Sequence, residues 1–456
     1  MKLVSRNPYT GQVLEEFEAM GFAESVSEAQ KSRRAFSDWK KASAEERGGY
    51  LKAIAGRLRV QARTFAETIT LEMGKPIGQS LAEIEKCAWL IDHFAENSAK
   101  FLQEETVKTD ALRSYLRFEP LGVILGIMPW NFPFWQVFRF AVPALMAGNV
   151  CLLKHASNVP ATALAIEKLF QDSGVPDQVF KTLLVDSQTA GQLIERELVD
   201  GVSLTGSVEA GSQIASLAGR HIKKVVLELG GSDPFIVLED ADIPQTARLA
   251  LQARMINSGQ SCIAAKRFIV MAASARPFLE ALEREVNGVK IGNPMEPETT
   301  IGPLAKKEFV GVLSGQLEDA KRKGARVVYG PPPPSGKGFF FRPAIVSQVE
   351  KDMRIVAEEV FGPILPVLVA RSEEDLIRMA NATPYGLGAS IWTRDLDRGE
   401  RIARKLEAGF VAINDIVKSD PRLPFGGIKK SGIGRELSEY GLKEFVNIKS
   451  VVVKGA

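Results

Sequence analysis

The sequence predicts an α/β protein with two α/β domains, and two patterns lead to that prediction. Between residues 141 and 238, short apolar runs alternate with segments whose apolar residues recur at helical spacing. A second alternation of the same kind covers residues 267–413. Strands that alternate with helices form mostly parallel sheets covered on both faces, so each set predicts its own sheet. The length of 456 residues, at about 150 residues per domain, agrees with two or three domains.

The first third of the chain predicts a hairpin, then helices, then an extended segment. Residues 1–20 alternate apolar and polar around the turn signal NPYTG, which is typical of a short hairpin. Residues 22–105 are rich in Ala, Glu, Lys and Leu at helical spacing. Residues 112–127 are expected to be extended.

The two alternating sets define the remaining elements. In the first set we expect strands at 150–153, 180–185, 202–205, 225–229 and 235–238. In the second we expect strands at 267–271 and 326–329, helices at 277–286 and 306–323, and a strand–helix–strand unit over 391–413. Residues 446–453 predict a C-terminal strand, which needs a partner strand in this or another subunit.

Composition and charge exclude several classes of protein. Lys and Arg total 58 against 55 Asp and Glu, so the net charge is +3 and we expect no nucleic-acid partner. Three Cys and three His, without zinc-binding spacing, predict neither a disulfide framework nor a metal site. The N-terminus lacks the apolar core of a signal peptide, and we find no convincing membrane span. We therefore expect a cytoplasmic protein with no membrane partner.

Two residues with reactive side chains have unusual neighbours in the sequence. Cys262 follows a helical stretch and is flanked by Gly259 and Ser261, so its sulfur could face a cleft. Most free cysteines are buried and inert, and this window alone favours that interpretation. Glu228 is a lone acid in an apolar strand run that ends in a Gly pair. It is either held by backbone N–H groups of the turn or, partly desolvated, is a general base.

The segment PWNFPFWQVFRF, residues 129–140, combines an amide, aromatic rings and a cation. Asn131 stands two residues before Pro133, and we expect it to cap the helix that follows. Trp135 and Arg139 are four residues apart and share a helical face. An arginine in so apolar a segment indicates either internal cation–π or salt-bridge packing, or an anion-binding pocket.

Two further positions fit a nucleotide phosphate. Ser207 stands where a strand leads into a helix, and the N–H groups at such a start can hold phosphate. Lys154 ends a predicted strand, and doubly wound sheets bind ligands at those ends. Each signal is weak alone, because Gly-containing turns and solvated lysines are common.

Seven segments, in order over essentially the whole chain, together resemble the aldehyde dehydrogenase superfamily. Within it, the phrases PWNFPFWQVFR, LLKHASN, LELGGSDPFIVL and AAKRF are most similar to short bacterial succinate-semialdehyde dehydrogenases. The seven segments are PWNFP at 129–133, Lys154 after its strand, TGS at 205–207, LELGG at 227–231, GQSC at 259–262, EEVFGP at 358–363 and PFGGIKKSGIGRE at 424–436.

The resemblance implies a mechanism for oxidising succinate semialdehyde to succinate. Cys262 would be the nucleophile that forms a thiohemiacetal, with the Asn131 amide and the Cys262 N–H as oxyanion hole. Hydride transfer to the nicotinamide would leave a thioester. Glu228 would activate the water that hydrolyses this thioester.

The resemblance also implies a Rossmann-like cofactor domain. Ser207 would contact the pyrophosphate, Lys154 the adenosine ribose, and Glu359 the nicotinamide ribose. Phe361 would pack nearby, and Trp130 would line the same groove.

Position 157 predicts which nicotinamide cofactor is preferred. Family members that prefer NAD often carry a glutamate three residues after the lysine. Here Ser157 takes that place. A serine beside Lys154 can hydrogen-bond a 2′-phosphate that a glutamate would repel, so we expect NADP to be preferred and NAD to be weaker.

For the substrate, the resemblance implies a carboxylate-binding Arg139. A charge-assisted contact of this kind favours a short ω-oxo acid. Some relatives add an arginine at the position of Ile256; here Arg254 is nearby, with no direction assigned. The substrate-binding residues we expect are Arg139, Trp135, Ser261 and Ser419.

By the same resemblance, the architecture is an aldehyde dehydrogenase fold in three parts. The cofactor-binding domain would cover 1–109 and 129–227, and the catalytic domain 228–430. Residues 110–128 and 431–456 would form a small bridging sheet between subunits, giving a homodimer or a dimer of dimers.

Several alternatives remain open from the sequence. Glutarate semialdehyde and neutral aldehydes are possible substrates. Relatives that transfer the acyl group to coenzyme A or phosphate generally lack a base such as Glu228, and a non-catalytic scaffold would not keep Cys262, Glu228 and Asn131 together. A cofactor-free cysteine hydrolase lacks an obvious histidine partner, although His155 and His221 lie near motifs.

Overall fold

The N-terminal hairpin and the helical run are formed as predicted. The computed structural model describes residues 2–336 and 338–455. The capping box of Ser43 and Glu46 starts the second helix, because each side chain accepts from the other residue's backbone N–H. The elements of this part are β1 (Lys2–Arg6), β2 (Val13–Glu18), α1 (Phe22–Trp39), α2 (Ala44–Val60), α3 (Ala62–Met73), α4 (Ile77–Phe101) and β3 (Glu105–Thr106).

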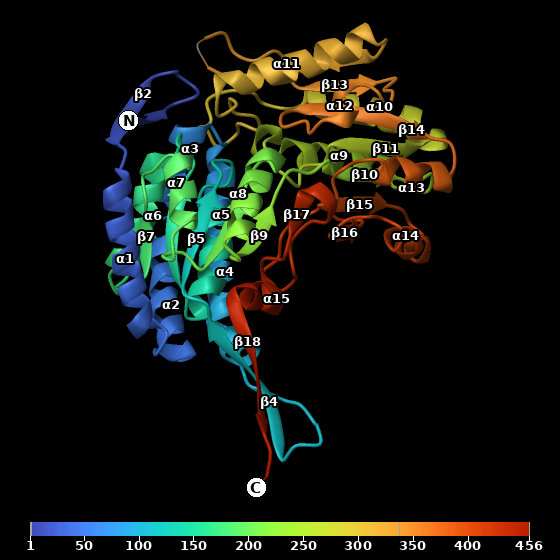
Figure 1. Ribbon diagram of the computed structural model, residues 1–456. Helices are drawn as coiled ribbons and strands as arrows, with labels where there is room; N and C mark the ends of the chain where they lie inside the picture. Colours follow the sequence, from blue (N-terminus) through green and yellow to red (C-terminus); the bar gives the residue numbers. More distant parts are fainter. Residues whose placement is uncertain (1, 337, 456) are drawn as a thin grey trace.

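The first large sheet has the strand order β17-β9-β8-β5-β6-β7. All its pairs are parallel except β17 with β9. Helices of the N-terminal half cover it in Figure 1. Its strands are β5 (Val123–Met128), β6 (Val150–His155), β7 (Phe180–Thr182), β8 (Gly201–Thr205), β9 (Lys224–Glu228) and β17 (Gly432–Ile433). The associated helices are α5 (Trp135–Met146), α6 (Pro160–Asp172), α7 (Ser187–Ile194) and α8 (Val208–Arg220).

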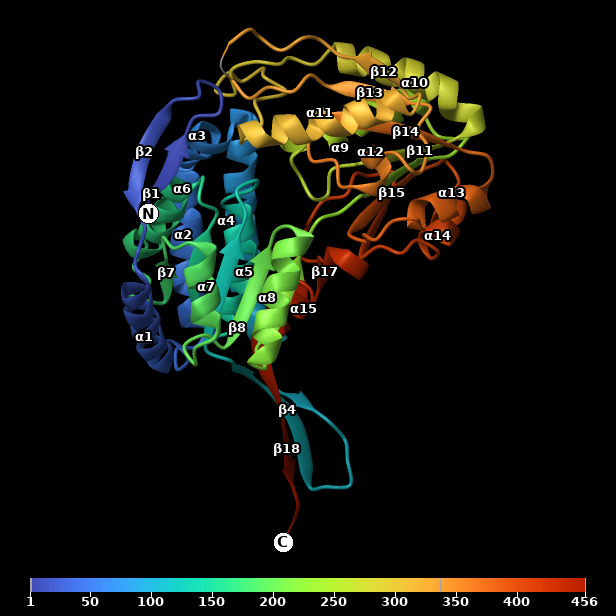
Figure 2. The ribbon, with the colours of Figure 1, turned by 45° about the horizontal axis from the view of Figure 1, so that its top comes forward.

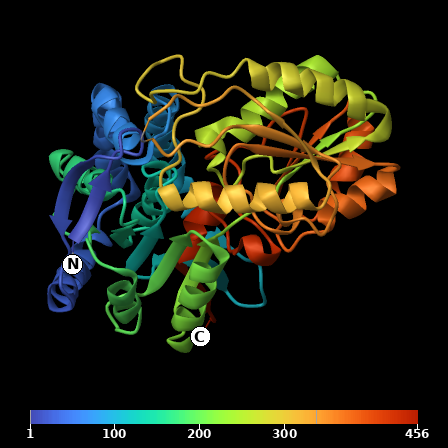
Figure 3. The same cartoon turned by 90° about the horizontal axis from the view of Figure 1, so that it is seen from above.

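The second large sheet has the order β12-β13-β14-β11-β10-β15-β16 and is also mostly parallel. Figure 3 shows its unit, yellow to red, beside the first, blue to green. Its strands are β10 (Pro234–Val237), β11 (Arg267–Met271), β12 (Arg326–Tyr329), β13 (Ala344–Ser347), β14 (Ile364–Ala370), β15 (Gly388–Trp392) and β16 (Phe410–Ile413). Its helices are α9 (Ile243–Met255), α10 (Ala272–Asn287), α11 (Lys307–Arg322), α12 (Arg354–Ala357), α13 (Glu373–Asn381) and α14 (Leu396–Ala403).

A small third sheet, in the order β18-β4-β3, projects from the body (Figure 2). It pairs β4 (Arg113–Pro120) with the C-terminal strand β18 (Val446–Val453), which lies where the sequence predicts it. The segments 110–128 and 431–456, predicted to form only the bridging sheet, each also contribute one strand to the first large sheet. The fully apolar β5 lies at the centre of the first sheet, and β17 closes that sheet's edge, because both bury their backbones against strands of that unit.

Each large sheet has its own aromatic core. In the first unit, Phe170 stacks on Phe180 with ring centroids 4.2 Å apart, and Phe138 joins them. In the second, Phe235 contacts Phe268 and Trp392. Burying such rings contributes about 1.5–3 kcal/mol each, so both cores stabilise the sheets on which they lie. In the described part of the chain, no helix is both long and apolar enough to cross a membrane.

Candidate active site

A pocket of about 510 Å³ lies where α4, α5 and α9 meet the loop that carries Cys262. The walls are largely apolar, and Phe132 and Phe425 are among them. The pocket brings together five residues predicted from the sequence: Trp135, Arg139, Ser261, Cys262 and Ser419. The predicted nucleophile and all the expected substrate-binding residues therefore line one cavity.

The loop before the cysteine has an uncommon backbone. Asn257, Ser258 and Gly259 have consecutive positive φ values of 52°, 56° and 82°. A side chain at Gly259 would put its Cβ 2.4 Å from the carbonyl carbon of Gly362, so the loop needs glycine at this point. The turn packs the GQSC motif closely against Gly362 of the EEVFGP motif, so these two motifs are in contact in the fold.

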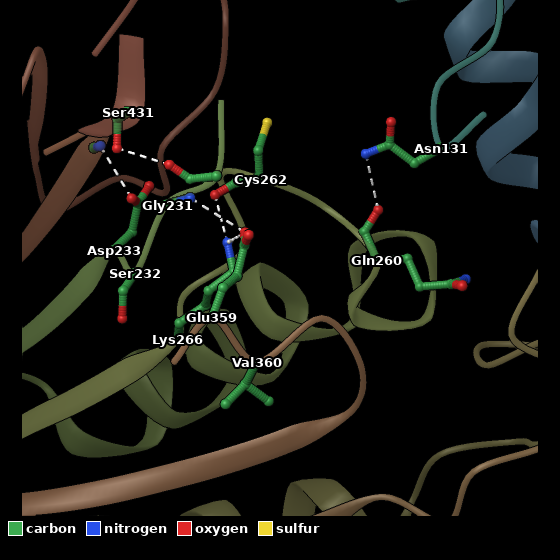
Figure 4. A network of polar contacts seen from close by, with 12 residues as sticks. Asn131, Gly231, Ser232, Asp233, Gln260, Cys262, Lys266, Glu359, Val360 and Ser431 are labelled. Carbon is green, nitrogen blue, oxygen red and sulfur yellow. Dashed lines mark hydrogen bonds and ion pairs between the residues drawn. The ribbon is translucent and has the colours of Figure 1, made fainter. Parts of the chain in front are cut away.

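A lysine under the loop holds the cysteine backbone (Figure 4). Lys266 Nζ donates to the Cys262 carbonyl oxygen at 2.5 Å and pairs with Glu359 Oε1 at 3.1 Å. Glu359 Oε1 also accepts from the Gly231 N–H at 3.2 Å. A Cβ at Gly231 would lie 2.8 Å from the Cys262 carbonyl oxygen, so glycine permits this close approach. Glu359, the predicted ribose ligand, is thus held in an ion pair with the lysine that binds the Cys262 carbonyl oxygen.

The thiol of Cys262 is protonated in these surroundings. Burial raises its pKa to about 11, and the nearby cations Arg139 and Lys266 oppose that rise. The carboxylates of Glu228 and Glu359 add to it. The Cys262 sulfur would therefore have to lose a proton before it could act as a nucleophile.

Asn131 does not cap the helix that follows it, so that prediction is wrong. Its Nδ2 donates to the Gln260 carbonyl oxygen at 3.1 Å, next to the cysteine loop. The N–H groups of Phe134 and Trp135 instead donate to Glu83 Oε1, each at 2.9 Å. A carboxylate from α4 satisfies the start of α5, which leaves the Asn131 amide beside the cysteine loop.

Glu228 belongs to a buried charged cluster with Arg139 and Glu436. Arg139 pairs closely with Glu436 and lies 3.9 Å from Glu228 Oε2, and all three side chains are at most 4% exposed. Burial raises the pKa of Glu228 well above its ordinary value, and Arg139 counteracts that rise. The sequence left internal salt-bridge packing and a place in a pocket as alternatives for Arg139. The structure shows both, because Arg139 makes an internal salt bridge and also lines the pocket.

The sequence analysis missed two residues of α4 that face the pocket. Glu83 and Lys86, three residues apart on one helical face, line it together with Gln79. Lys86 Nζ donates to Ser419 Oγ at 2.8 Å and lies 4.3 Å above the Trp135 ring. The available signal was a pair of charged residues beside the apolar stripe of a long helix.

A second cavity, of about 400 Å³, contains Lys154 and Ser157 at the carboxyl end of β6. The Asn158 amide lines it too, and both its polar atoms lack a hydrogen-bond partner in the described structure although they are buried. A cation, a hydroxyl and an unsatisfied amide fit the phosphate and ribose of a nucleotide. These residues would hold the adenosine end of a nicotinamide cofactor.

The other predicted cofactor residues lie on neighbouring elements. Trp130 stacks on Phe309, with centroids 5.1 Å apart, and meets Phe361 edge-to-face. Ser207 is the N-cap of α8, and its hydroxyl accepts from the Ala210 N–H. Ser207 thus stands at the start of a helix, where backbone N–H groups can bind an anion.

Two candidate residues are engaged elsewhere. His155 is buried between the carbonyl oxygens of Met128 and Pro133, and burial lowers its pKa to about 4. It cannot act as the base partner that a cysteine hydrolase needs. Arg254 donates to the carbonyl oxygens of Ala265 and of residues 360 and 362, away from the pocket.

Comparison with known proteins defines the class of this fold and site. The family model described as "Aldehyde dehydrogenase family" matches residues 1–451. A Synechocystis protein named "Probable succinate-semialdehyde dehydrogenase", with NADP(+) in its name, is 45% identical over 451 residues and 99% of each chain. Succinate-semialdehyde dehydrogenase (NADP(+)) 1 of Mycobacterium tuberculosis is 42% identical over 454 residues, again over 99% of each chain.

A solved structure of a related enzyme indicates the same family. The crystal structure of a succinic semialdehyde dehydrogenase from Streptococcus pyogenes with NADP+ has a TM-score of 0.97 at 36% identity, covering 99% of this chain and 100% of that one. The chain belongs to the aldehyde dehydrogenase family. The predicted fold class and the predicted aldehyde dehydrogenase class of enzyme are thereby confirmed.

Proposed function

We propose that this enzyme oxidises succinate semialdehyde to succinate and prefers NADP over NAD. The observation that carries the proposal is the single pocket that joins Cys262 to Arg139, Trp135, Ser261 and Ser419. An apolar cavity with cationic and hydroxyl groups at one wall suits a short aldehyde that ends in a carboxylate. The names of the bacterial relatives point to the same substrate.

The chain's own residues account for each step. The thiol of Cys262 gives up its proton to water, and its sulfur attacks the aldehyde carbon to form a thiohemiacetal. The Asn131 amide and the Cys262 N–H stabilise the oxyanion. A nicotinamide cofactor, when bound, would supply the acceptor for the hydride of this thiohemiacetal. Glu228, as carboxylate, then takes a proton from the water that attacks the resulting thioester, and the released acid leaves Cys262 free.

For the cofactor, we propose that Lys154, Ser157 and Asn158 hold the adenosine ribose and its 2′-phosphate. The support is the cavity they share and the unsatisfied Asn158 amide. Burial lowers the pKa of Lys154, and the cation of Lys306 adds to this effect. A bound phosphate would relieve that repulsion between the two cations.

We also propose that β18 mediates assembly into a homodimer or a dimer of dimers. In the described residues its partner is β4 on one side, and its other edge is open. Ile448 and Val452 are 55% and 65% exposed on this strand. An open, apolar edge strand is a surface that a second subunit covers.

The test follows the absorbance of reduced nicotinamide with purified enzyme. We expect faster turnover of succinate semialdehyde than of butanal or glutarate semialdehyde, and a higher kcat/KM with NADP than with NAD. Equal or better turnover of butanal would refute the substrate assignment. An equal or higher kcat/KM with NAD would refute the cofactor preference, whatever the substrate result.

A further inference from the structure

The pocket contains a cation that the reaction described above does not use. Lys86, on α4, is one of the residues that line it. Its ammonium has three N–H donors. In the described residues its hydrogen-bond partner is the Ser419 hydroxyl at 2.8 Å, so donors remain for a further acceptor.

The charges around Lys86 are unbalanced. Within residues 2–336 and 338–455, no carboxylate oxygen lies within 4.0 Å of its ammonium. Of the neighbouring acids, Glu83 is paired with Lys75 and Asp420 with Arg422. Burial lowers the pKa of Lys86 to about 8, and the cation of Arg139 adds to this effect. The Lys86 ammonium therefore has no counterion beside it in the described residues.

Arg139, by contrast, already has two acids. It pairs with Glu436 and lies 3.9 Å from Glu228. Lys86 has no such partner, so it is the cation of the pocket that is left without a carboxylate beside it. One substrate carboxylate would complete this balance, since buried charges are stable when they are paired.

The side chains around Lys86 fix the position of its charge. The Trp135 ring lies 4.3 Å below the ammonium, and Ser419 holds it from the loop before the PFGG segment. A cation held between a ring face and a hydroxyl loses little rotamer freedom when it binds an anion.

We propose that Lys86 is the residue that binds the carboxylate of the ω-oxo acid, oriented by Ser419 and Trp135, whereas Arg139 sets the charge of Glu228. This assignment rests on the proposed function and names the specificity-determining contact of the same pocket. It makes Lys86 a substrate-binding residue beyond those expected from the sequence.

The test compares Lys86→Met, Lys86→Arg and the control Lys52→Met, an exposed lysine of α2. Each variant is assayed with succinate semialdehyde and with butanal, which has the same chain without the carboxylate. Loss of a charge-assisted contact should raise KM for the semialdehyde about 10- to 100-fold in Lys86→Met, with kcat/KM for butanal within about twofold. Lys86→Arg should restore most of the KM, and Lys52→Met should match the parent enzyme.

A second readout needs neither cofactor nor turnover. Succinate, as the carboxylate probe, should slow alkylation of Cys262 by iodoacetamide in the parent enzyme and in Lys52→Met. This protection should disappear in Lys86→Met. Melting temperatures of all variants show that each is folded.

The outcomes separate the two proposals. Equal losses for both aldehydes, or full succinate protection in Lys86→Met, would overturn the role of Lys86 even if the parent enzyme prefers the semialdehyde. A parent enzyme without that preference would overturn the proposed function, while loss of succinate protection in Lys86→Met would still support a carboxylate site at Lys86.

Discussion

Replacing Arg139 by methionine would remove the cation that opposes protonation of Glu228. Arg139 Nη2 lies 3.9 Å from Glu228 Oε2, and both side chains are 2% exposed. At an effective dielectric constant of about 20, a charge pair at this distance is worth about 4 kcal/mol, or about three pKa units. Because Glu436 shares the arginine, we expect the pKa of Glu228 to rise by about one to three units.

The assay is stopped-flow reduction of NADP over pH 6–10 with succinate semialdehyde. A carboxylate must be ionised to act as base, so a higher pKa moves the acid limb of thioester hydrolysis to higher pH. In Arg139→Met the limb should move up by about one to three units, whereas Arg139→Lys, which keeps the charge, should stay within about half a unit.

The result that refutes the reasoning is an Arg139→Met enzyme whose acid limb coincides with that of the parent enzyme. A uniform loss of rate at every pH would mean that Arg139 acts on binding or folding and not on Glu228. Breaking a buried pair costs about 3–5 kcal/mol, so the melting temperature of each variant must be measured alongside.

Four further outcomes are expected. Glu228→Gln should give a full burst of reduced cofactor, one per active site, followed by a steady-state rate roughly 10²- to 10⁴-fold lower, seen by stopped-flow; a lost burst would place the residue before hydride transfer. Ser157→Glu should lower the ratio of kcat/KM for NADP to that for NAD by about tenfold or more, through repulsion of the 2′-phosphate; an unchanged ratio would remove Ser157 from cofactor choice. Glu83→Ala should lower the free energy of unfolding by about 3–5 kcal/mol in urea titration, because Lys75 loses its buried partner; a change below about 1 kcal/mol would contradict the cap. In cofactor-free enzyme, the rate of Cys262 alkylation by iodoacetamide should stay low at pH 7 and rise toward pH about 11; a plateau near neutral pH would show a thiolate already formed.

The strands could be predicted well because their signals are local. The segments 267–271, 326–329 and 446–453 have the predicted limits, since apolar runs bounded by turn residues mark buried strands. The sheet to which a strand belongs is decided by pairing, which is not local. For this reason the extended segment before Pro129 was assigned to one bridging sheet, although its second half is a central strand of the first unit.

The sequence motifs name residues that line the pocket, but they do not name the residues of α4 that contact them, Glu83 and Lys86. Asn131 was expected to cap its own helix, but Glu83, 51 residues away in sequence from Phe134, performs that role. Lys86 comes from the same helix, and its partner Ser419 is 333 residues distant. Contacts between residues so far apart in sequence cannot be inferred from the local spacing of residue types. From the sequence alone, a charged residue on a long helix is therefore expected to face solvent.

The way in which β17 completes the first sheet has a consequence for synthesis of the protein. The edge strand β17 and Glu436, the partner of Arg139, follow the whole second sheet in the sequence. Nascent domains fold as units from the N-terminus, yet here the first sheet needs residues that are synthesised after the second unit. A ribosome that stops before residue 432 would release two nearly finished sheets in which Arg139 has Glu228 beside it and lacks Glu436. The ion pair of Arg139 with Glu436 therefore forms only after both units have been synthesised.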